Sequence, residues 1–177
     1  MTAKAFDELF RKHYPEIFCH CQRIVNNKED AEELAEDTFV KANLNIAKFN
    51  PNKANFRTWI FTIATNTSLD FLRSGSQKKQ KQTQSLDELV LKEDGSPDPV
   101  EQSEYHQLME FINECLHTLP AQQRIAVSLR HLQEFTLQEI AQIIGKSSPN
   151  TVRNRIKLGE KKMKKCLEDK GIDDYWC

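Results

Sequence analysis

Apolar residues recur at helical spacing through most of the chain, and this pattern predicts a protein built from α-helices. Within residues 3–73 it predicts three helices. The first carries an apolar stripe over Phe6–Ile24, the second covers Lys28–Lys48, and the third covers Phe56–Arg73. The sequence Asn50-Pro51-Asn52-Lys53 is typical of a turn and separates the last two helices.

The composition changes after these three helices. Residues 76–99 are rich in Gln, Lys and Ser and end in a Gly- and Pro-containing sequence, so we expect them to form a flexible linker. Helical spacing returns over residues 100–119 and again over 121–132. We therefore predict an all-α fold of two small helical domains, an N-terminal one over 1–75 and a C-terminal one over 100–177.

The stretch that begins at Thr136 predicts a helix-turn-helix. Thr136 and Glu139 have capping-box spacing at the start of an apolar helical face, and Gly145 can take the left-handed conformation that ends such a helix. Pro149 then fits the first turn of a second helix. In motifs of this kind the second helix can enter the major groove of DNA.

This second helix has an apolar face and a polar, basic face. Val152, Ile156, Met163 and Leu167 fall on one narrow stripe that should pack inward. Asn pairs bidentately with adenine and Arg or Lys with guanine, whereas the later lysines are better placed for phosphates. For the lysines alone, a solvated basic face is the alternative interpretation. The polar face consists of Asn150, Asn154, Lys157 and Lys161, flanked by Arg153, Lys164 and Lys165.

The helix predicted over Lys28–Lys48 has two distinct faces. Ala35, Phe39, Ala42 and Ile46 share one of them, which suits the core. The other combines carboxylates with apolar residues, which is typical of a surface that docks on another protein. A central helix that is covered on both sides would show the same pattern, which therefore leaves both interpretations open. The second face consists of Glu33, Asp37, Val40 and Leu44, with Glu36 beside them.

The helix predicted over Phe56–Arg73 carries hydroxyls and an amide opposite its apolar face, and basic residues follow it. Such groups could bind single-stranded DNA, although the signal is weak by itself. Trp59 lies near the boundary between the faces and is more often a core residue than a stacking platform. The predicted core face holds Phe56, Ile60, Ile63, Thr67 and Phe71, and the opposite face holds Thr58, Thr62, Thr65, Asn66, Leu69 and Arg73.

Composition narrows the class of protein. The chain has 177 residues, and no apolar run approaches the roughly 20 residues that span a bilayer. The N-terminus lacks the apolar region of a secretory signal, so we expect a cytoplasmic protein. The net charge of -1 hides an acidic run over Glu29–Asp37 and a basic end over Lys146–Lys170. The basic end suggests phosphate contacts, and the acidic run suggests a protein partner.

The five cysteines do not suggest a disulfide framework, because their number is odd and no signal peptide is apparent. Cys19-His20-Cys21 is a poor zinc motif, because neighbouring helical residues point about 100° apart. We therefore expect buried or tolerated thiols, no metal and no cofactor. No nucleophile-base pair or glycine-rich phosphate loop predicts an enzyme, which leaves a metal sensor or enzyme as a weakly supported alternative.

Several of these stretches resemble one family in order and spacing. Asp30-Ala-Glu-Glu-Leu-Ala-Glu-Asp-Thr-Phe-Val-Lys-Ala is followed by Phe56-Arg-Thr-Trp-Ile-Phe-Thr-Ile-Ala-Thr-Asn and Asp70-Phe-Leu-Arg. After the linker come Leu119-Pro-Ala-Gln-Gln-Arg and the helix-turn-helix. Together they resemble the extracytoplasmic-function sigma factors, two-domain members of the sigma-70 family of bacterial transcription initiation factors. The resemblance covers nearly the whole chain.

The resemblance implies roles for three groups of residues. The acidic helix would dock on the clamp helices of core RNA polymerase through Glu33, Leu34, Glu36, Asp37, Val40, Lys41 and Leu44. The loop after it would capture a flipped base of the minus-ten promoter element, with contacts from Phe49, Asn52, Lys53, Asn55, Phe56, Arg57, Trp59, Thr62, Asn66 and Arg73. The C-terminal domain would read the minus-thirty-five element through Ser148, Asn150, Thr151, Arg153, Asn154, Arg155, Lys157 and Lys161.

The resemblance also implies partners. They are core RNA polymerase, promoter DNA in double- and single-stranded form, and an anti-sigma factor that silences the protein, with no stable homo-oligomer. The function implied is that of an alternative sigma factor, which directs the polymerase to specific promoters and helps to open the DNA. A stand-alone helix-turn-helix regulator is the alternative, and it would bind palindromic half-sites without polymerase.

Three positions depart from the family pattern. Many relatives have a glutamine where Glu36 stands, an arginine where Leu158 stands and an alanine where Gly159 stands. The extra carboxylate could retune docking, and the missing arginine removes a DNA contact. Leu158 itself could touch a thymine methyl or a neighbouring helix. Gly159 should weaken the second helix of the motif by up to about 1 kcal/mol.

Overall fold

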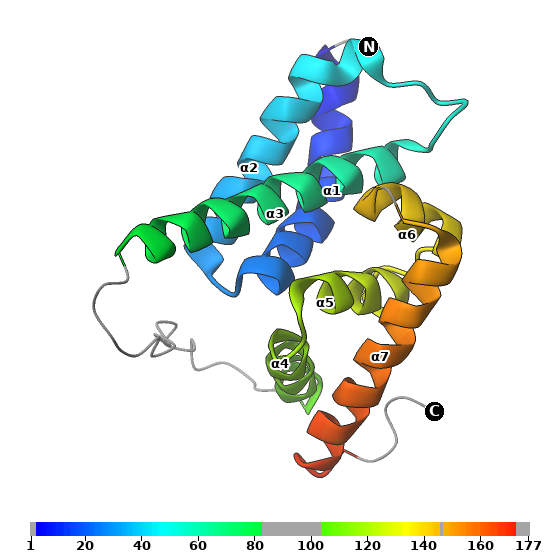
Figure 1. The fold of residues 1–177 in the computed structure, drawn as a ribbon. Coiled ribbons are helices and arrows are strands. Elements are labelled where there is room, and N and C mark those ends of the chain that lie inside the picture. The colour runs from blue at the N-terminus through cyan, green and yellow to red at the C-terminus, as the bar shows by residue number, and fades with distance from the viewer. Residues whose placement is uncertain (1–2, 83–103, 146, 173–177) are drawn as a thin grey trace.

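The computed structural model describes residues 3–82, 104–145 and 147–172, and every regular element in these ranges is helical. The N-terminal domain consists of α1 (Ala3–Val25), α2 (Lys28–Asn45) and α3 (Phe56–Gln82), with a short 3-10 turn over Ile46–Lys48 after α2. The three predicted helices of this domain are thus confirmed (Figure 1). None of the described helices combines the length and apolar character needed to cross a membrane.

The C-terminal domain contains four α-helices within the described residues. They are α4 (Glu104–His117), α5 (Ala121–Val127), α6 (Leu137–Ile144) and α7 (Pro149–Glu168). A π-helical turn over 128–132 continues α5. The last two helices form the predicted helix-turn-helix.

The predicted boundaries of this motif are present as hydrogen bonds. The Oγ1 atom of Thr136 accepts from the backbone N–H of Glu139, while the Glu139 carboxylate accepts from the backbone N–H of Thr136, which completes the capping box. Gly145 ends α6 with φ 68° and ψ 150°, a combination that essentially only glycine adopts. Ser148 caps α7, and Pro149 occupies its first turn.

The third helix differs from its prediction in length and in its buried faces. It continues past Arg73 to Gln82, because Gln and Lys are good helix formers. The predicted linker therefore begins with helical residues, and its part from 83 onward lies outside the described residues. Thr58, Thr65 and Leu69 are buried instead of outward-facing, and Phe71 is 37% exposed instead of buried.

The position of α3 between the two domains explains this difference. On one side it packs against α1 and α2, and on the other it packs against α6 of the C-terminal domain (Figure 1). The Phe61 and Phe135 rings meet edge to face across this contact, with centroids 4.9 Å apart. One continuous cluster of buried side chains runs from Ile17 of α1 through Phe61 to Ile140 of α6. The hydroxyl face of α3 is thus divided: Thr58 meets Glu139 of the C-terminal domain, whereas Thr65 is buried against His20 of α1.

A second apolar cluster holds α4, α5 and α7 together, and it is formed by Ile112, Cys115, Leu116, Leu119, Val127, Met163 and Leu167. Beside it, Cys115 and Cys166 form a disulfide, although the cysteine count argued against disulfides. The prediction failed because the two residues are separated by 51 positions in sequence and meet only through the packing of α4 on α7. Of the other described cysteines, Cys19 is half-buried and Cys21 is buried, and both are free.

Candidate functional site

The acidic face of α2 is uncovered in the described part of the chain. Val40 is 57% exposed and Leu44 is 77% exposed, and they are flanked by the exposed carboxylates of Glu33, Glu36 and Asp37. The opposite face is buried and includes Ala35 and Phe39, as predicted. The interpretation in which α2 is covered on both sides is therefore wrong. We call Glu33, Glu36, Asp37, Val40 and Leu44 the acidic-apolar face.

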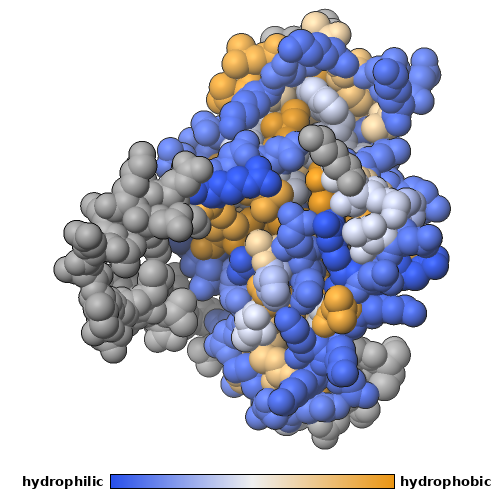
Figure 2. Space-filling model, viewed as in Figure 1, coloured by the Kyte–Doolittle hydropathy of each residue, from blue (hydrophilic) through white to orange (hydrophobic). Residues whose placement is uncertain are grey.

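Figure 2 shows the setting of this face. Apolar surface appears at the end of the molecule where α2 finishes, and another apolar area lies below α3 on the same side (Figure 2). Exposed apolar area on a soluble domain marks a surface for a partner, and the surrounding carboxylates favour a basic one.

Two residues that the resemblance assigned to this contact have other roles in the structure. Leu34 is only 4% exposed and belongs to the core, so its prediction as a direct contact is corrected: it supports the helix from beneath. Lys41 is exposed, but its Nζ donates to the Thr67 hydroxyl over 3.1 Å. This bond joins α2 to α3 beside the acidic-apolar face.

The loop after α2 leads into an aromatic cluster. The ring of Phe49 lies 5.1 Å from that of Trp59 and 5.8 Å from that of Phe56, all between centroids, and all three side chains are half-buried. The loop itself is closed by the Asn50 side chain, whose Oδ1 accepts from the backbone N–H of Asn52. Asn52 and Lys53 are exposed at its tip. Half-buried rings next to an exposed polar loop could hold an unstacked base.

Asn55 and Arg57 connect this region to the C-terminal domain. The Asn55 Oδ1 caps α3 by accepting from the Thr58 N–H over 2.6 Å, and its Nδ2 donates to Glu139 over 3.4 Å. The Arg57 Nε donates to Glu16 over 2.9 Å. Two further Arg57 nitrogens donate to the backbone and side-chain oxygens of Gln133 over 3.0 and 2.9 Å.

The Arg57 guanidinium also lies against the two rings of the interdomain contact. Its Cζ is 4.3 Å from the Phe135 centroid and 5.2 Å from that of Phe61. Glu16, Gln133, Phe135 and Glu139 thus belong to this site, and sequence reasoning did not find them. The sequence offered one signal, the aromatic residue Phe135 directly before the capping box.

Glu139 is held ionised at this junction. Partial burial favours the neutral acid, but hydrogen bonds from Thr136, Thr58 and Asn55 outweigh it and lower the pKa of the Glu139 carboxyl. The carboxylate therefore serves both the cap of α6 and the contact with α3 at neutral pH.

The remaining predicted minus-ten residues lie further along α3. Asn66 and Arg73 are exposed on α3, and Arg73 pairs with Asp70 over 3.1 Å. Thr62 is half-buried, and its hydroxyl donates to the Thr58 carbonyl over 2.8 Å. Asn66 and Arg73 therefore face solvent, whereas Asn55 and Arg57 are engaged by the C-terminal domain.

In α7 the predicted division into two faces is confirmed. Val152, Ile156, Gly159, Met163 and Leu167 are buried. On the exposed face, the side chains best suited to reading bases have no intramolecular side-chain partner among the described residues. They belong to Asn150, Arg153, Asn154 and Lys157, with Lys161 one turn further along.

Three residues near the start of α7 that we predicted to contact DNA make hydrogen bonds within the protein. Ser148 accepts from the Thr151 N–H over 3.2 Å, and the two hydroxyls are 3.0 Å apart. Arg155 donates to the Ser147 hydroxyl over 2.9 Å, which fixes the turn between α6 and α7. Leu158 is 55% exposed, so it is not packed on a neighbouring helix in the described residues.

The Cys19-His20-Cys21 sequence is part of the core. His20 is fully buried, and its Nε2 lies 2.9 Å from the Thr65 hydroxyl. Burial, with a smaller contribution from the charge of Arg23, lowers the pKa of His20 to about 3. Burial likewise raises the pKa of Cys21 to about 11. These groups are thus held neutral.

Two family models match the chain. The model described as Sigma-70 region 2 matches residues 9–78, and the one described as Sigma-70, region 4 matches residues 112–163. The first covers the acidic-apolar face and the aromatic cluster. The second covers α5, α6 and most of α7.

Curated relatives and solved structures point to the same family. The RNA polymerase sigma factor YlaC of Bacillus subtilis is 32% identical over 171 residues, which cover 95% of this chain and 97% of that protein. The ECF RNA polymerase sigma factor SigW of the same species is 28% identical, over 93% of this chain and 90% of that protein.

Among solved structures, RpoE of Bartonella quintana, crystallised with the anti-sigma factor NepR, has a TM-score of 0.78 at 22% identity, covering 94% of this chain and 98% of that chain. CnrH, in complex with the cytosolic domain of CnrY, has a TM-score of 0.69 at 20% identity, covering 95% and 90%. These two similarities concern the fold. None of the reported relatives is a stand-alone helix-turn-helix regulator. By its family models and curated relatives, the chain belongs to the extracytoplasmic-function sigma factors of the sigma-70 family.

Proposed function

We propose that this chain acts as an alternative sigma factor: it binds core RNA polymerase, directs it to specific promoters and helps to open the DNA. The observation that carries the proposal is the acidic-apolar face of α2, exposed in the region 2 match and followed in the same chain by a helix-turn-helix in the region 4 match. A protein that only reads duplex DNA has no need of such a face. The proposal places the protein in the cytoplasm, where the polymerase works.

Docking on the polymerase uses the acidic-apolar face. Val40 and Leu44 supply apolar area, and Glu33 and Asp37 orient the complex by their charge. Glu36 adds a carboxylate where many relatives have a glutamine. Because the Lys41–Thr67 bond joins α2 to α3, docking would also set the position of the aromatic cluster.

Opening of the minus-ten element uses the loop and the aromatic cluster. Unstacking one base costs a few kcal/mol. A base that enters beside Phe49, Phe56 and Trp59 would exchange its stacking partners for aromatic rings. Asn66 and Arg73 lie exposed along α3 and would guide the strand. Binding energy from the polymerase would offset the rest, so no ATP is required.

Recognition of the minus-thirty-five element uses the exposed face of α7. Asn150, Arg153, Asn154 and Lys157 would meet base edges and nearby phosphates, and Lys161 would meet the backbone. Ser148, Thr151 and Arg155 fix the start of this helix, so any contact that they make with DNA is additional to that role.

The interdomain contact implies a change of shape during function. Asn55 and Arg57 are bonded to Glu139 and Gln133, so their predicted contacts with minus-ten DNA require the C-terminal domain to move away. The described arrangement is then the inactive form. An anti-sigma partner that binds both domains would hold this form, and the structurally similar RpoE was crystallised with an anti-sigma factor.

Transcription in a purified system tests the proposal. Core RNA polymerase is mixed with the protein and a library of genomic fragments, and new transcript starts are mapped. We expect discrete starts that share two upstream elements and are absent with core enzyme alone. Direct DNA binding by the protein without any new start would contradict the proposal and would favour a stand-alone regulator.

A further inference from the structure

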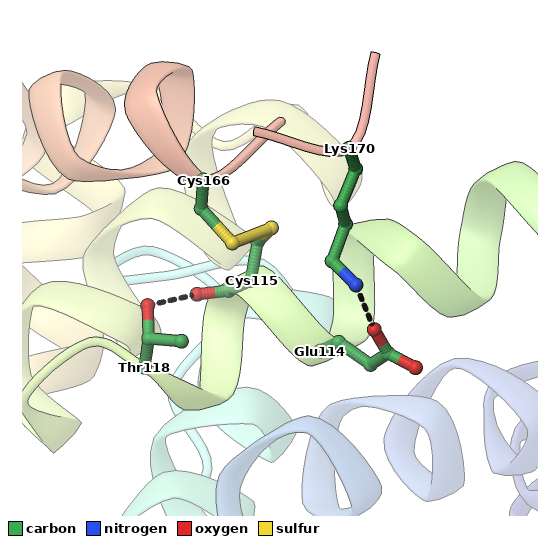
Figure 3. Close-up of a disulfide and its surroundings, with 5 residues drawn as sticks. All are labelled: Glu114, Cys115, Thr118, Cys166 and Lys170. Carbon is green, nitrogen blue, oxygen red and sulfur yellow. Dashed lines mark hydrogen bonds and ion pairs between the residues drawn. A yellow bond between two sulfur atoms is a disulfide. The ribbon is translucent and has the colours of Figure 1, made fainter. Parts of the chain in front are cut away.

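The disulfide in the C-terminal domain has no part in the proposed function. It joins Cys115 of α4 to Cys166 of α7, whose Cα atoms are 5.7 Å apart (Figure 3). The Cys115 side chain is fully buried, whereas Cys166 is half-buried at the edge of the apolar cluster. One sulfur therefore lies in the interior, and the other is nearer to solvent.

Noncovalent contacts join α4 to α7 beside this bond. Ile112 and Leu116 of α4 and Met163 and Leu167 of α7 are buried in one apolar cluster. Figure 3 shows a second, noncovalent connection beside the disulfide, in which Lys170 binds the carboxylate of Glu114. The Lys170 ammonium also lies 4.9 Å from the centre of the Phe111 ring. After reduction, the two thiols would still lie between α4 and α7 in this apolar cluster.

If the protein has the proposed function, it works in the cytoplasm, where a disulfide is unusual. A protein that works with RNA polymerase acts where small thiols keep cysteines reduced, and disulfides there are usually transient or redox-sensing. The other described cysteines are free, and burial raises the pKa of Cys21 to about 11, which makes that thiol unreactive.

We propose that Cys115 and Cys166 form a reversible thiol-disulfide site that sets the stability of the C-terminal domain according to the redox state of the cell. The oxidised form cross-links α4 to the last turns of α7, the helix that carries the candidate base-reading residues on its first turns. The reduced form keeps the fold but lacks the cross-link. Oxidation would thereby protect promoter reading under conditions that destabilise the domain.

The exchange balances with a small thiol such as glutathione. Its thiolate attacks the Cys166 sulfur, the less buried of the two. The sulfur–sulfur bond breaks, the Cys115 thiolate leaves and takes up a proton, and Cys166 carries a mixed disulfide. A second small thiol releases Cys166 as a thiol. In total, one protein disulfide and two small thiols give two protein thiols and one oxidised small-molecule disulfide, and oxidation is the reverse.

The first experiment measures occupancy of the bond. The purified full chain is equilibrated in buffers of varied ratio of reduced to oxidised glutathione, quenched in acid, alkylated and analysed by peptide mass spectrometry. We expect Cys115 and Cys166 to pass together from one disulfide to two alkylated thiols within the series. Alkylation of both in every buffer, or a bond that survives the most reducing one, would overturn the proposal.

The second experiment measures the consequence of the bond. Closing a loop of this length implies that reduction lowers the Tm of the wild-type chain by about 5–15 °C. Cys166→Ser and Cys115→Ala should each lose this dependence on reductant, while Cys19→Ser, the matched control, should keep it. An equal Tm for oxidised and reduced wild-type protein would refute the stabilising role. Neither experiment contains polymerase, so a negative result would leave the proposed sigma-factor function untouched.

Discussion

Gly159 of α7 packs closely against α5. A Cβ atom built on this glycine would be 2.5 Å from Cγ2 of Val127, a short and stiff side chain. Many relatives have alanine at this position. In this chain the contact with Val127 explains the glycine, although glycine weakens the helix.

For Gly159→Ala, two effects of opposite sign compete. Alanine favours the helix by up to about 1 kcal/mol, whereas overpacking a closed interior costs about 1–3 kcal/mol. We expect the free energy of unfolding to fall by about 1 kcal/mol, as measured by urea denaturation. In a Val127→Ala background the clash is absent, so the same change should be neutral or stabilising. A gain in both backgrounds would show that the contact is not tight.

The buried histidines predict how acid affects stability. The pKa of His20 is about 3 in the folded chain and near 6.5 when unfolded, so between these values the unfolded chain binds a proton that the folded chain does not. Stability therefore falls as the pH falls through this window, by about 2 kcal/mol at pH 5 from His20 alone. Burial lowers the pKa of His13 and that of His117, the latter to about 4, in the same direction.

Two measurements check this expectation. Urea denaturation at pH 7 and pH 5 should show the loss of stability, and NMR should show the His20 imidazole still neutral at pH 5. An imidazole that titrates near pH 6.5 in the folded protein would contradict the structural assignment of His20 to the core.

At the scale of elements, the acidic-apolar face of α2 gives the sharpest test of docking. Asp37→Arg combined with Val40→Asp reverses a charge and removes apolar area on this face, and both side chains are exposed. We expect polymerase binding to fall at least tenfold in a pull-down titration, with an unchanged helical circular dichroism spectrum.

Glu110→Arg provides the control for this variant. It reverses an exposed charge on α4, outside the acidic-apolar face, and should bind polymerase as the wild type does. Equal binding by the double variant and the control would place the docking surface elsewhere.

The sequence predicted the helices and their ends better than it predicted which residues pack against them. The capping box at Thr136 and Glu139 and the stripe from Val152 to Leu167 are local signals, and both appear in the structure. Burial of Thr58 depends on the domain that contains Glu139, which lies 81 positions away in the chain. The pairing of Cys115 with Cys166 is nonlocal in the same sense, so no spacing rule could reveal either feature.

At the scale of the whole molecule, Arg57 is the centre of the interdomain contact. It binds Glu16 and Gln133 and lies over the Phe135 ring. Arg57→Ala should weaken the contact and increase the radius of gyration in small-angle X-ray scattering, while each domain keeps its helices. Arg73→Ala, which removes an exposed arginine from the same helix, should leave the radius of gyration unchanged. An unchanged radius in Arg57→Ala would mean that apolar packing alone holds the domains together.

The hydrogen bonds at the starts of α3 and α6 bear on how this molecule comes apart. Asn55 uses its oxygen to cap α3 and its nitrogen to reach Glu139, while Glu139 uses one oxygen to cap α6 and the other to meet Asn55 and Thr58. The Asn55–Glu139 and Thr58–Glu139 bonds between the domains are 3.4 Å long, and the capping bonds belong to each helix separately. Separation of the domains breaks these two bonds, the Arg57–Gln133 bonds and the Phe61–Phe135 contact, but it breaks none of the capping bonds. Separation would uncover the apolar surface between Phe61 and Phe135, but both helices would keep their capped first turns. Each domain would then meet its own promoter element with that helix already formed.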